Sequence, residues 1–353
     1  MTELAAAVAR ARGSLYFSGA RIADDLGRFL AEQGDACLAL GHGYAPAIEQ
    51  ITLIGSGGSW ASLLTAKYLL DGIVGVPVEA LPSFELIWRD PVRLGPGTLV
   101  VVATYSGETE DTVKALRFAQ ERGARTLALV GRPGSTAARE AEAAVTYDSG
   151  AIFEVPVAAL ALLGEGMADK GRRGVAADLR RGLGALPGLL RSALAAEERR
   201  AEARAREFQD VDHLYVLGAG PLAPLAYKMA LTVVMENIRI GATYCDASEF
   251  RHGPAEALAR IAPAMLFLVG TDAARETTRQ TLAFCQERGA RTLVYDAAEL
   301  GGAGLHPLLT PLLLNSFTQW FTVYAAIARG ITDLDERVFM GHRVLTTDGS
   351  AWP

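Results

Sequence analysis

Two stretches of the chain share one pattern of hydrophobic and polar positions. Each begins with a short apolar run, passes through a glycine turn, and continues with apolar residues at helical spacing. This pattern predicts a buried strand, a tight turn and a helix. The stretches are ITLIGSGGSWASLLTAKYLL (51–70) and LYVLGAGPLAPLAYKMALTV (214–233), in which Gly55 corresponds to Gly218.

A second pair of matching segments lies further along each half. The octapeptide QERGARTL occurs at 120–127 and again at 286–293. Each copy follows a helical pattern, is interrupted by Gly123 or Gly289, and leads into a β-rich run. Glycine after the last helical residue is typical of a helix end. Both pairs of segments together predict a duplicated domain.

Strands that alternate with helices imply parallel sheets covered on both faces. We therefore expect an α/β fold of two tandem domains, each a parallel sheet sandwiched by helices. The expected parts are an N-terminal helical segment that packs on the first half, a first domain, a helical linker, a second domain and a tail. Their predicted ranges are 1–45, 46–170, 171–208, 209–345 and 346–353.

Composition narrows the class of protein. The chain has 353 residues, of which 50% are hydrophobic and 21% charged, with a net charge of −6. An acidic balance disfavours nucleic acid and anionic membranes as partners. The N-terminus lacks the pattern of a signal peptide, and no apolar run approaches the ~20 residues of a membrane span. Three cysteines without CxxC spacing disfavour a disulfide framework or a structural zinc site. We expect a cytoplasmic protein.

The first glycine turn, ITLIGSGGSW, presents backbone amides at a helix start, which suits a phosphate group. A dinucleotide is one candidate ligand, because Gly55 and Gly57 begin a GxGxxG pattern and Glu79 follows at a suitable distance. However, Trp60 stands where the third glycine is required for close helix–strand packing. This substitution disfavours a nicotinamide cofactor.

A hydroxyl-rich loop follows the next predicted strand of the first half. In VVATYSGETEDT (101–112) the hydroxyl-bearing residues and Gly107 form a compact candidate cradle for a phosphate monoester. Hydroxyls at this place also cap helices, and the two roles are compatible. The equivalent second-half segment, FLVGTDAARETT, has Asp272 in place of the cluster, which predicts that the duplicate lost the phosphate site. The candidate hydroxyls are those of Thr104, Ser106, Thr109 and Thr112.

The loop TYSGETEDT resembles the phosphate loop of the sugar isomerase (SIS) family, and the resemblance extends over the chain from about residue 45. The family's members carry two flavodoxin-like α/β domains, so the resemblance implies that architecture here. It also implies that one group of residues binds a sugar phosphate, with Tyr105 as a further possible contact. That group is Gly57, Ser59, Thr104, Ser106 and Thr109.

The segment MENIRIGATYCDASEFRHGPAEAL (235–258) resembles the catalytic region of two groups in this family. One is the isomerase domain of glucosamine-6-phosphate synthases, and the other comprises the fructoselysine-6-phosphate deglycases and related deglycases of Amadori products. The stretches 219–228, 248–254 and 304–314 are similar to those of the deglycases. Synthases and the related deaminases carry a lysine three residues before the helix glutamate, where this chain has Val233.

The resemblance implies a role for each residue of this region. Glu236 would move a proton between adjacent carbons, in a mostly apolar setting that favours partial desolvation. His252 would act as acid or base near neutral pH. Glu249 would orient His252 or contact the substrate, and His306 is a further possible site residue. The alternatives are a solvated helix glutamate for Glu236 and turn-stabilising histidines.

These assignments favour a deglycase that converts a fructosamine 6-phosphate into an aldose 6-phosphate and a free amine. The reaction requires no metal and no redox cofactor, so we expect none. Two alternatives stay open: an isomerase or deaminase of sugar phosphates, and a sensor that binds a sugar phosphate without turnover. The resemblance also implies a homodimer or higher oligomer with the site at the interface, to which the His252 loop could come from the neighbouring subunit.

Overall fold

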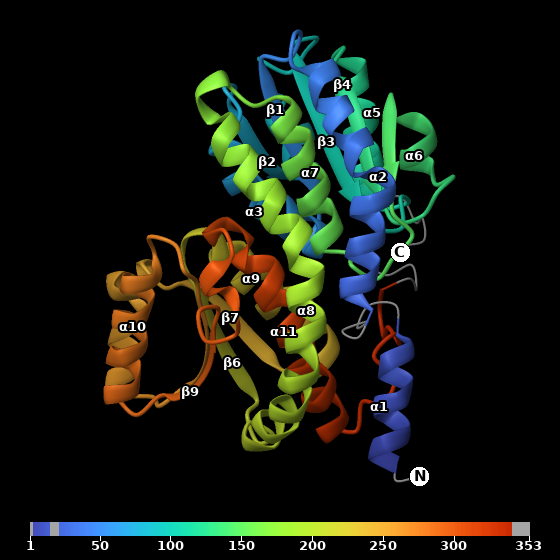
Figure 1. The fold of residues 1–353 in the computed structure, drawn as a ribbon. Helices are drawn as coiled ribbons and strands as arrows, with labels where there is room; N and C mark the ends of the chain where they lie inside the picture. Colours follow the sequence, from blue (N-terminus) through green and yellow to red (C-terminus); the bar gives the residue numbers. More distant parts are fainter. Residues whose placement is uncertain (1–2, 15–20, 341–353) are drawn as a thin grey trace. The chain divides into compact units, whose positions relative to one another are not determined.

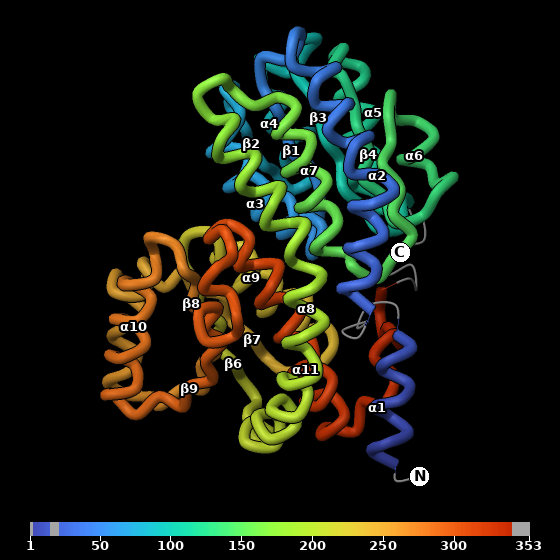
Figure 2. The backbone as a smooth tube through the Cα atoms, in the orientation of Figure 1, coloured from blue at the N-terminus to red at the C-terminus, as the bar shows by residue number. Residues whose placement is uncertain are grey.

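The structure is a computed structural model that describes residues 3–14 and 21–340. The described residues form two compact units, each with its own internal contacts. The first unit contains residues 25–181 and 335–340, and the second contains 182–334 together with the described residues before 25. The helix α8 (Arg173–Glu207) contributes residues to both units and is continuous in the backbone trace of Figure 2, and the first turn of α2 (Ile22–Tyr44) also lies across the division.

A five-stranded parallel sheet in the order β2-β1-β3-β4-β5 forms the centre of the first unit. Helices cover both of its faces (Figure 1). The strands are β1 (Gln50–Gly55), β2 (Val78–Pro82), β3 (Thr98–Thr104), β4 (Arg125–Val130) and β5 (Ala143–Thr146). The helices are α2 (Ile22–Tyr44), α3 (Gly57–Asp71), α4 (Ser83–Arg89), α5 (Glu110–Glu121), α6 (Thr136–Glu140), α7 (Glu154–Gly166) and the short 3₁₀ turn Lys170–Arg172.

Strand β3 shows how this sheet is held between its helices. All of its residues are buried, as expected of a central parallel strand with both faces covered. Successive side chains of a strand point to opposite faces. Val100 and Val102 accordingly pack in the cluster formed with α4, α5 and α6. Because β3 is buried on both faces, it holds the start of the loop that follows Thr104 in place.

The second unit is built on a four-stranded parallel sheet in the order β7-β6-β8-β9. Its strands are β6 (His213–Gly218), β7 (Gly241–Asp246), β8 (Ala264–Val269) and β9 (Arg291–Asp296). Its helices are α1 (Glu3–Gly13), α9 (Ala223–Lys228), the π-helix η3 (Met229–Ile238), α10 (Arg275–Glu287) and α11 (Thr310–Ala328). Short 3₁₀ turns span Gly220–Leu222, Glu249–His252, Pro254–Ala259, Gly302–Gly304 and Pro307–Leu309.

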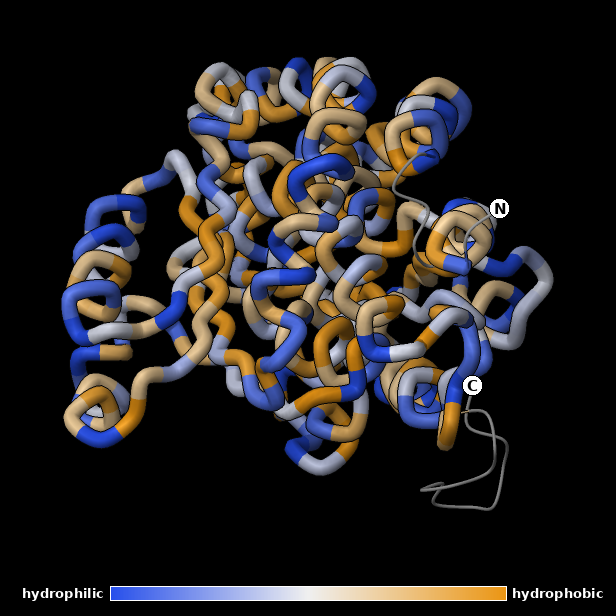
Figure 3. The backbone as a smooth tube through the Cα atoms, turned by 90° about the horizontal axis from the view of Figure 1, so that it is seen from below, coloured by the Kyte–Doolittle hydropathy of each residue, from blue (hydrophilic) through white to orange (hydrophobic). Residues whose placement is uncertain are grey.

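The predicted duplication is confirmed by the strand order. In each sheet the first strand pairs with the second on one side and the third on the other, so β1, β2, β3 and β4 correspond to β6, β7, β8 and β9. An order of 2-1-3-4-5 is that of flavodoxin-like folds. Figure 3 shows hydrophobic positions along the strands and many hydrophilic ones on the helices around them.

The repeated octapeptide has the same structure in both copies. It covers the last turn of α5 or α10, a glycine with positive φ, and the start of β4 or β9. The glycine φ values are +79° for Gly123 and +82° for Gly289. In each copy the glutamine amide donates to a threonine hydroxyl of the strand (Gln120 to Thr126, 3.5 Å; Gln286 to Thr292, 3.0 Å). The repeat is therefore a shared scaffold connection.

The prediction that the N-terminal segment packs on the first half is wrong for α1. This helix belongs to the second unit and lies against α11. Its buried residues are Ala7 and Ala11, whose small side chains permit a close approach. Arg12 adds a cation–π contact to Trp320, 5.0 Å from the ring centroid, and an ion pair with Glu198. Arg12 thus joins α1 to residues of α11 and α8.

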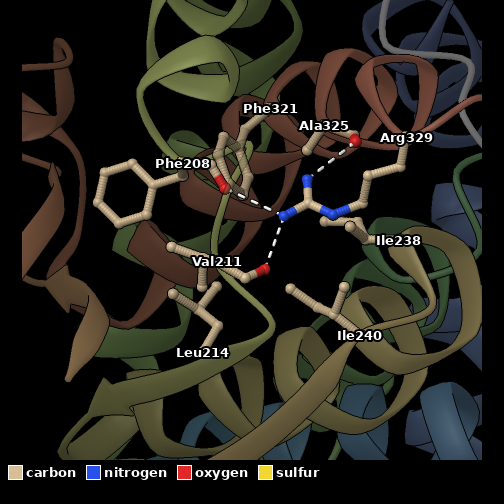
Figure 4. Close-up of a pocket in the computed structure, with 8 residues that line it drawn as sticks. All are labelled: Phe208, Val211, Leu214, Ile238, Ile240, Phe321, Ala325 and Arg329. Atoms are coloured by element: carbon tan, nitrogen blue, oxygen red, sulfur yellow. Dashed lines mark hydrogen bonds between the residues drawn. The ribbon is translucent and has the colours of Figure 1, made fainter.

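The end of α11 is tied to the start of β6 by Arg329. Its guanidinium donates to the backbone carbonyls of Phe208, Val211 and Ala325 at 3.0, 2.7 and 3.2 Å (Figure 4). A small apolar cavity lies beside it, and burial lowers the pKa of Arg329. These bonds fix the end of α8 and the chain entering β6. Among the described residues, none of the helices combines the length and apolar character of a membrane span.

Candidate functional site

The carboxyl ends of β1 and β3 bring two helix starts together in the first unit. These strands are parallel neighbours, with Gly55 paired to Ala103. Strand β1 connects to α3 and strand β3 to α5. The sheet order reverses at β1, because β2 lies on one side and β3 on the other. Ligands of open α/β sheets bind at such a switch point, outside the carboxyl ends of the strands.

Neither helix is capped by the side chain of its own N-cap residue. Ser56 precedes α3 and Thr109 precedes α5, and both hydroxyls are turned elsewhere. The Ser56 hydroxyl donates to Asp111, and the Thr109 hydroxyl lies 2.8 Å from that of Thr104. The first backbone amides of a helix lack intrahelical partners and attract anions. Two helix starts that their cap side chains leave open therefore suit a phosphate group.

The predicted hydroxyl loop is folded into a compact turn. Thr104 Oγ1 accepts a bond from the Gly107 amide at 3.2 Å, and Ser106 Oγ accepts one from the Glu108 amide at 3.1 Å. Thr109 Oγ1 lies 3.5 Å from Ser106 Oγ. The structure therefore gathers Thr104, Ser106 and Thr109 in one cluster, as the sequence predicts.

Gly107 allows this turn to lie against the neighbouring loop. Its φ is +70°, and a Cβ placed there would come 1.9 Å from Ser135 Oγ. The Gly107 carbonyl accepts a bond from the Ala137 amide at 3.0 Å, and the Glu108 carboxylate accepts one from the Thr136 amide at 2.8 Å. The hydroxyl loop is thus fixed by the β4–α6 connection.

The other residues predicted for phosphate binding have distinct surroundings. Gly57 begins α3 with a φ of +55°, and Ser59 lies in the first turn of that helix, where its carbonyl accepts a bond from Ser62 Oγ at 2.7 Å. The Tyr105 ring packs over Gly131 and lies 6.3 Å from the Tyr147 ring between centroids. Gly57 and Ser59 share the β1–α3 turn beside the hydroxyl cluster.

Thr112 is not part of the cradle, contrary to the sequence expectation. Its side chain is buried, and its hydroxyl lies 2.9 Å from that of the buried Ser83. Thr112 lies inside α5, where its hydroxyl is engaged with Ser83 of α4 rather than with the hydroxyl loop. The candidate cradle therefore has three hydroxyls from the β3–α5 loop.

The corresponding turn of the second unit is filled by a carboxylate. Asp272 Oδ1 accepts a bond from the Ala274 amide at 2.8 Å. A Cβ on Gly220 would lie 3.1 Å from Asp272 Oδ1, and one on Gly270 would lie 2.2 Å from Asp272 Oδ2. The side chain of Asp272 thus occupies the space between the two turns with its own negative charge, which opposes a second anion there.

Glu236 lies near the end of the π-helix η3 in the second unit. The sequence predicts a helix here, but not its π register, in which Arg239 donates to the carbonyl of Val234 at 2.9 Å. Glu236 is partly exposed, whereas Val233 and Val234 are buried. The glutamate therefore stands at the border between the apolar side of the helix and the surface.

Asn237 supports this unusual helix from within. Its side chain is buried, and its amide nitrogen lies 3.4 Å from the Thr232 carbonyl and 3.3 Å from the Val233 carbonyl. The carbonyls of Thr232 and Val233 lie five and four residues before Asn237. The Asn237 side chain therefore reaches two backbone carbonyls of its own helix. Single π-type turns are frequent at functional sites.

Glu249 and His252 lie on a short 3₁₀ turn after β7. Asp246 stabilises the residue before this turn, because its Oδ1 accepts bonds from the Ser248 amide at 2.8 Å and from the Ser248 hydroxyl at 2.6 Å. Gly253 ends it with a φ of +152°. In the described part of the chain, the exposed side chains of Glu249 and His252 make no hydrogen bond to each other, so the orienting role expected for Glu249 has no contact to support it.

His306 has a structural role in the second unit. Its Nδ1 accepts a bond from the Leu308 amide at 3.3 Å and caps the turn Pro307–Leu309. The other predicted residues flank β7 at opposite ends: η3, which carries Glu236, leads into the amino end of the strand, and the turn with Glu249 and His252 follows its carboxyl end. The six residues of β7 separate the two places. In the described ranges, no three histidine, cysteine, aspartate or glutamate side chains gather as a metal site would.

Sequence reasoning missed three residues beneath the cradle, namely Ser56, Ser83 and Asp111. Ser56 and Ser83 directly follow β1 and β2, and Asp111 lies in the first turn of α5, the helix after β3. Two of them could have been noticed in the sequence: Asp111 lies within TYSGETEDT, and Ser83 directly follows the strand VEALP. Their mutual hydrogen bonds depend on how the three strands pair, which the local sequence does not display.

The comparisons with known proteins agree with this architecture. Residues 47–163, which include β1, β3 and the hydroxyl loop, match the SIS domain family. This stretch of the first unit is therefore a SIS domain. It is 29% identical over 295 residues to the fructoselysine 6-phosphate deglycase of Escherichia coli strain K12, which covers 83% of this chain and 86% of that protein.

Two further relatives extend the comparison. The fructosamine deglycase of Bacillus subtilis strain 168 is 28% identical over 284 residues, covering 76% of this chain and 84% of that protein. The glutamine–fructose-6-phosphate aminotransferase of Leifsonia xyli is 30% identical over 325 residues, and the match spans 52% of its length.

Solved structures confirm the fold. A candidate phosphosugar isomerase of Bacillus subtilis has a TM-score of 0.74 and 26% identity, covering 87% of this chain and 98% of that one. The C-terminal domain of the glucosamine–fructose-6-phosphate aminotransferase of Francisella tularensis has a TM-score of 0.70 and 22% identity, covering 88% and 98%. The two-sheet α/β architecture is thus that of SIS proteins.

Proposed function

We propose that this chain is a sugar-phosphate enzyme, and specifically a deglycase that splits a 6-phosphorylated Amadori product into an aldose 6-phosphate and a free amine. The observation that carries the proposal is the match to proteins named as fructoselysine 6-phosphate and fructosamine deglycases, which extends over both halves of the chain. The hydroxyl cradle of the first unit supports a phosphorylated substrate.

Phosphate binding is the role proposed for the first unit. The hydroxyls of Thr104, Ser106 and Thr109 and the first turns of α3 and α5 offer neutral donors and two positive helix ends. Gly57 and Ser59 contribute from the β1–α3 turn. An anchor of this kind binds ground state and transition state alike, so it serves to hold the sugar while its other end reacts.

The proposed chemistry moves one proton between two carbons. An Amadori product is a 1-amino-1-deoxy-ketose, and removal of a C1 proton gives a 1,2-enaminol. Return of that proton to C2 gives an imine at C1. Water adds to this imine, the C1–N bond breaks, and the products are the aldose phosphate and the amine. The sequence of steps is balanced without an oxidant or a reductant.

Glu236 is proposed to carry the proton between C1 and C2. A solvated glutamate has a pKa of about 4.3, so the role benefits from partial removal of water. The buried Val233 and Val234 beside it provide an apolar side. His252 is proposed to exchange the proton at the ring oxygen or the departing amine, because imidazole titrates near neutral pH. Its exposed turn leaves it accessible to substrate.

The test is to incubate the purified chain with fructoselysine 6-phosphate and follow glucose 6-phosphate release. We expect Glu236→Gln and His252→Ala each to lower kcat by roughly 10²-fold or more, as removal of an acid–base group does. His213→Ala is the matched control for His252→Ala, since His213 begins β6 and contacts Thr243 near the amino end of β7, whereas the His252 turn follows the carboxyl end of that strand. Unchanged release by Glu236→Gln would refute the proposed role of Glu236.

A phosphosugar isomerase is the second candidate, favoured by the 26% identity to the Bacillus subtilis structure. The same proton shuttle converts a ketose phosphate into an aldose phosphate without loss of an amine. Turnover of fructose 6-phosphate or glucosamine 6-phosphate, with none of fructoselysine 6-phosphate or fructose-asparagine 6-phosphate, would replace the deglycase by this candidate. Binding of sugar phosphates without any turnover would instead indicate a sensor.

A further inference from the structure

Four polar side chains form a hydrogen-bonded network beneath the candidate phosphate cradle. They come from three connections at the carboxyl edge of the sheet, after β1, β2 and β3. Ser83 and Thr112 are buried, and Ser56 and Asp111 are partly exposed. In the predicted chemistry none of the four touches the reacting carbons. The network consists of Ser56, Ser83, Asp111 and Thr112.

The network is continuous. Ser56 Oγ donates to Asp111 Oδ2 and lies 3.1 Å from Ser83 Oγ. Ser83 Oγ lies 2.9 Å from Thr112 Oγ1. Asp111 Oδ1 accepts a bond from the Thr112 amide at 2.8 Å. Asp111 thus bonds with one oxygen to its own helix α5 and with the other to the turn that begins α3.

Because of this network, Ser56 does not play the usual role of a serine at an N-cap position. Serine at an N-cap position usually accepts a bond from a backbone amide of its own helix, but Ser56 does not. Its hydroxyl is engaged with Asp111 instead. The bond therefore has two effects: it leaves the α3 start uncapped by Ser56, and it joins the turn carrying Gly57 and Ser59 to the helix that follows the hydroxyl loop.

We propose that Asp111 is a positioning residue that, through Ser56 and Ser83, sets the separation of the two turns holding the substrate's phosphate. This inference deepens the proposed function and rests on it for the identity of the ligand as a sugar phosphate. The two turns meet at the switch point between β1 and β3, so a small shift of either would change the geometry of every donor in the cradle.

The charge of Asp111 makes the proposal testable by the sign of an effect. A carboxylate beneath an anion site repels a phosphate, so its charge alone weakens binding. Substitution by alanine removes that repulsion together with the hydrogen bonds that the carboxylate accepts from Ser56 and Thr112. If repulsion were the main contribution of Asp111, the alanine variant would bind phosphate more tightly. If positioning dominates, the same variant binds more weakly.

The experiment is calorimetric titration of the full chain with glucose 6-phosphate, which requires no turnover. We expect Asp111→Ala to weaken binding by roughly 10-fold or more, in line with the loss of hydrogen bonds to a charged group. Asp111→Asn retains an acceptor for the Thr112 amide and should restore part of the affinity. Asp71→Asn, at the far end of α3 where Asp71 pairs with Lys67, is the matched control and should leave affinity unchanged.

Ser56→Ala and Ser83→Ala test the same network without altering a charge. Both should weaken binding, and Ser56→Ala combined with Asp111→Ala should be no worse than the single Asp111→Ala change, because the two residues act through one bond. Urea unfolding of each variant shows whether it is folded; if Asp111→Ala is not, the two serine variants decide the question.

Turnover provides a readout that a general loss of stability would not reproduce. With the deglycase substrate, Asp111→Ala should raise KM and leave kcat within about two-fold, because a phosphate anchor binds ground and transition states alike. Equal or tighter binding of glucose 6-phosphate by Asp111→Ala, with wild type binding normally, overturns the positioning proposal alone. Failure of wild type itself to bind overturns the proposed phosphate site on which it rests.

Discussion

Single glycines in the first unit allow the hydroxyl loop to form. Gly107 and Gly134 both have φ near +70°, but their surroundings differ. A Cβ on Gly107 would collide with Ser135, whereas a Cβ on Gly134 would meet no heavy atom within 4 Å. An alanine at Gly134 would meet only the strain of a left-handed backbone, whereas an alanine at Gly107 would meet that strain and a steric clash as well.

Gly107→Ala should destabilise the protein by about 2–4 kcal/mol, since it combines backbone strain with overpacking. Gly134→Ala should cost only about 1 kcal/mol, the backbone contribution alone. Urea unfolding of both variants measures the difference. Equal losses in the two variants would show that Ser135 moves aside freely, and the loop would then be less constrained than its contacts indicate.

A second prediction at this scale concerns acid. The Arg291 guanidinium bonds both oxygens of Asp210, at 3.1 and 2.6 Å, and lowers the pKa of that carboxyl to about 2. A carboxyl whose pKa is lower in the folded state stabilises the fold above its ordinary pKa of 3.8, and loses this contribution as pH falls toward 2.

Asp210→Asn should therefore make the urea midpoint less dependent on pH between about 4 and 2. The effect is small and salt-sensitive because the pair is exposed. If, at low salt, the urea midpoint of Asp210→Asn falls between about pH 4 and 2 as steeply as that of wild type, the assignment of this pKa shift to Arg291 is contradicted.

At the scale of elements, the π-helix η3 is the least regular part of the fold. Its ten residues, Met229–Ile238, carry Glu236, and the element ends with Arg239 in the left-handed region at φ 60°. A π register places side chains at different angles from those of an α-helix. The direction of Glu236 therefore depends on contacts that hold the register, of which the Asn237 amide is one.

Asn237→Ala should destabilise the second unit by about 1–2 kcal/mol through its lost hydrogen bonds. It should also lower kcat for the proposed reaction while leaving glucose 6-phosphate binding unchanged, because the cradle lies in the first unit. Met235→Ala is the control on the same helix, since Met235 is exposed and should affect neither quantity strongly. An Asn237→Ala enzyme with normal kcat would show that Glu236 does not need this register.

At the scale of the whole molecule, duplication has produced two sheets with corresponding strand orders but different residues after their third strands. The first unit has hydroxyls after its third strand, and the second has Asp272, whose carboxylate fills the corresponding turn. A sugar phosphate should therefore be recognised by one unit only. This asymmetry leaves the second unit to carry Glu236 and His252.

Hydrogen exchange should show this division directly. Saturation with glucose 6-phosphate should slow exchange in 55–60 and 104–112 and leave 270–275 unaffected. At a ligand concentration of 100 times Kd the stabilisation of the binding form is about 2.7 kcal/mol. Protection around Asp272 equal to that of the hydroxyl loop would mean that the duplicate also binds phosphate.

The homodimer with a shared site stays a prediction, and mixing two inactive variants tests it. If the His252 turn serves the site of the neighbouring subunit, a mixture of Glu236→Gln and His252→Ala chains should recover activity, since some mixed dimers contain one intact site. If all residues of a site belong to one chain, no recovery is expected. Mixing either variant with itself is the control.

Local sequence predicted those features that depend on neighbours in the chain. The strand and helix periodicities, the glycine after α5 and α10, and the hydroxyls of Thr104, Ser106 and Thr109 are all readable within a window of a few residues. Periodicity reports which face of an element is apolar, and glycine reports a backbone that needs positive φ. For that reason the two α/β repeats and the hydroxyl loop were predicted from the sequence alone.

Only the tertiary structure decided which side chains meet. Thr112 faces the buried Ser83 instead of the cradle, Ser56 bonds to Asp111 instead of capping α3, and α1 packs on α11 rather than on the first unit. The register of η3 likewise depends on Asn237 within a packed unit. Each of these outcomes is set by partners distant in sequence or by competition between hydrogen bonds, and local pattern carries no information on either.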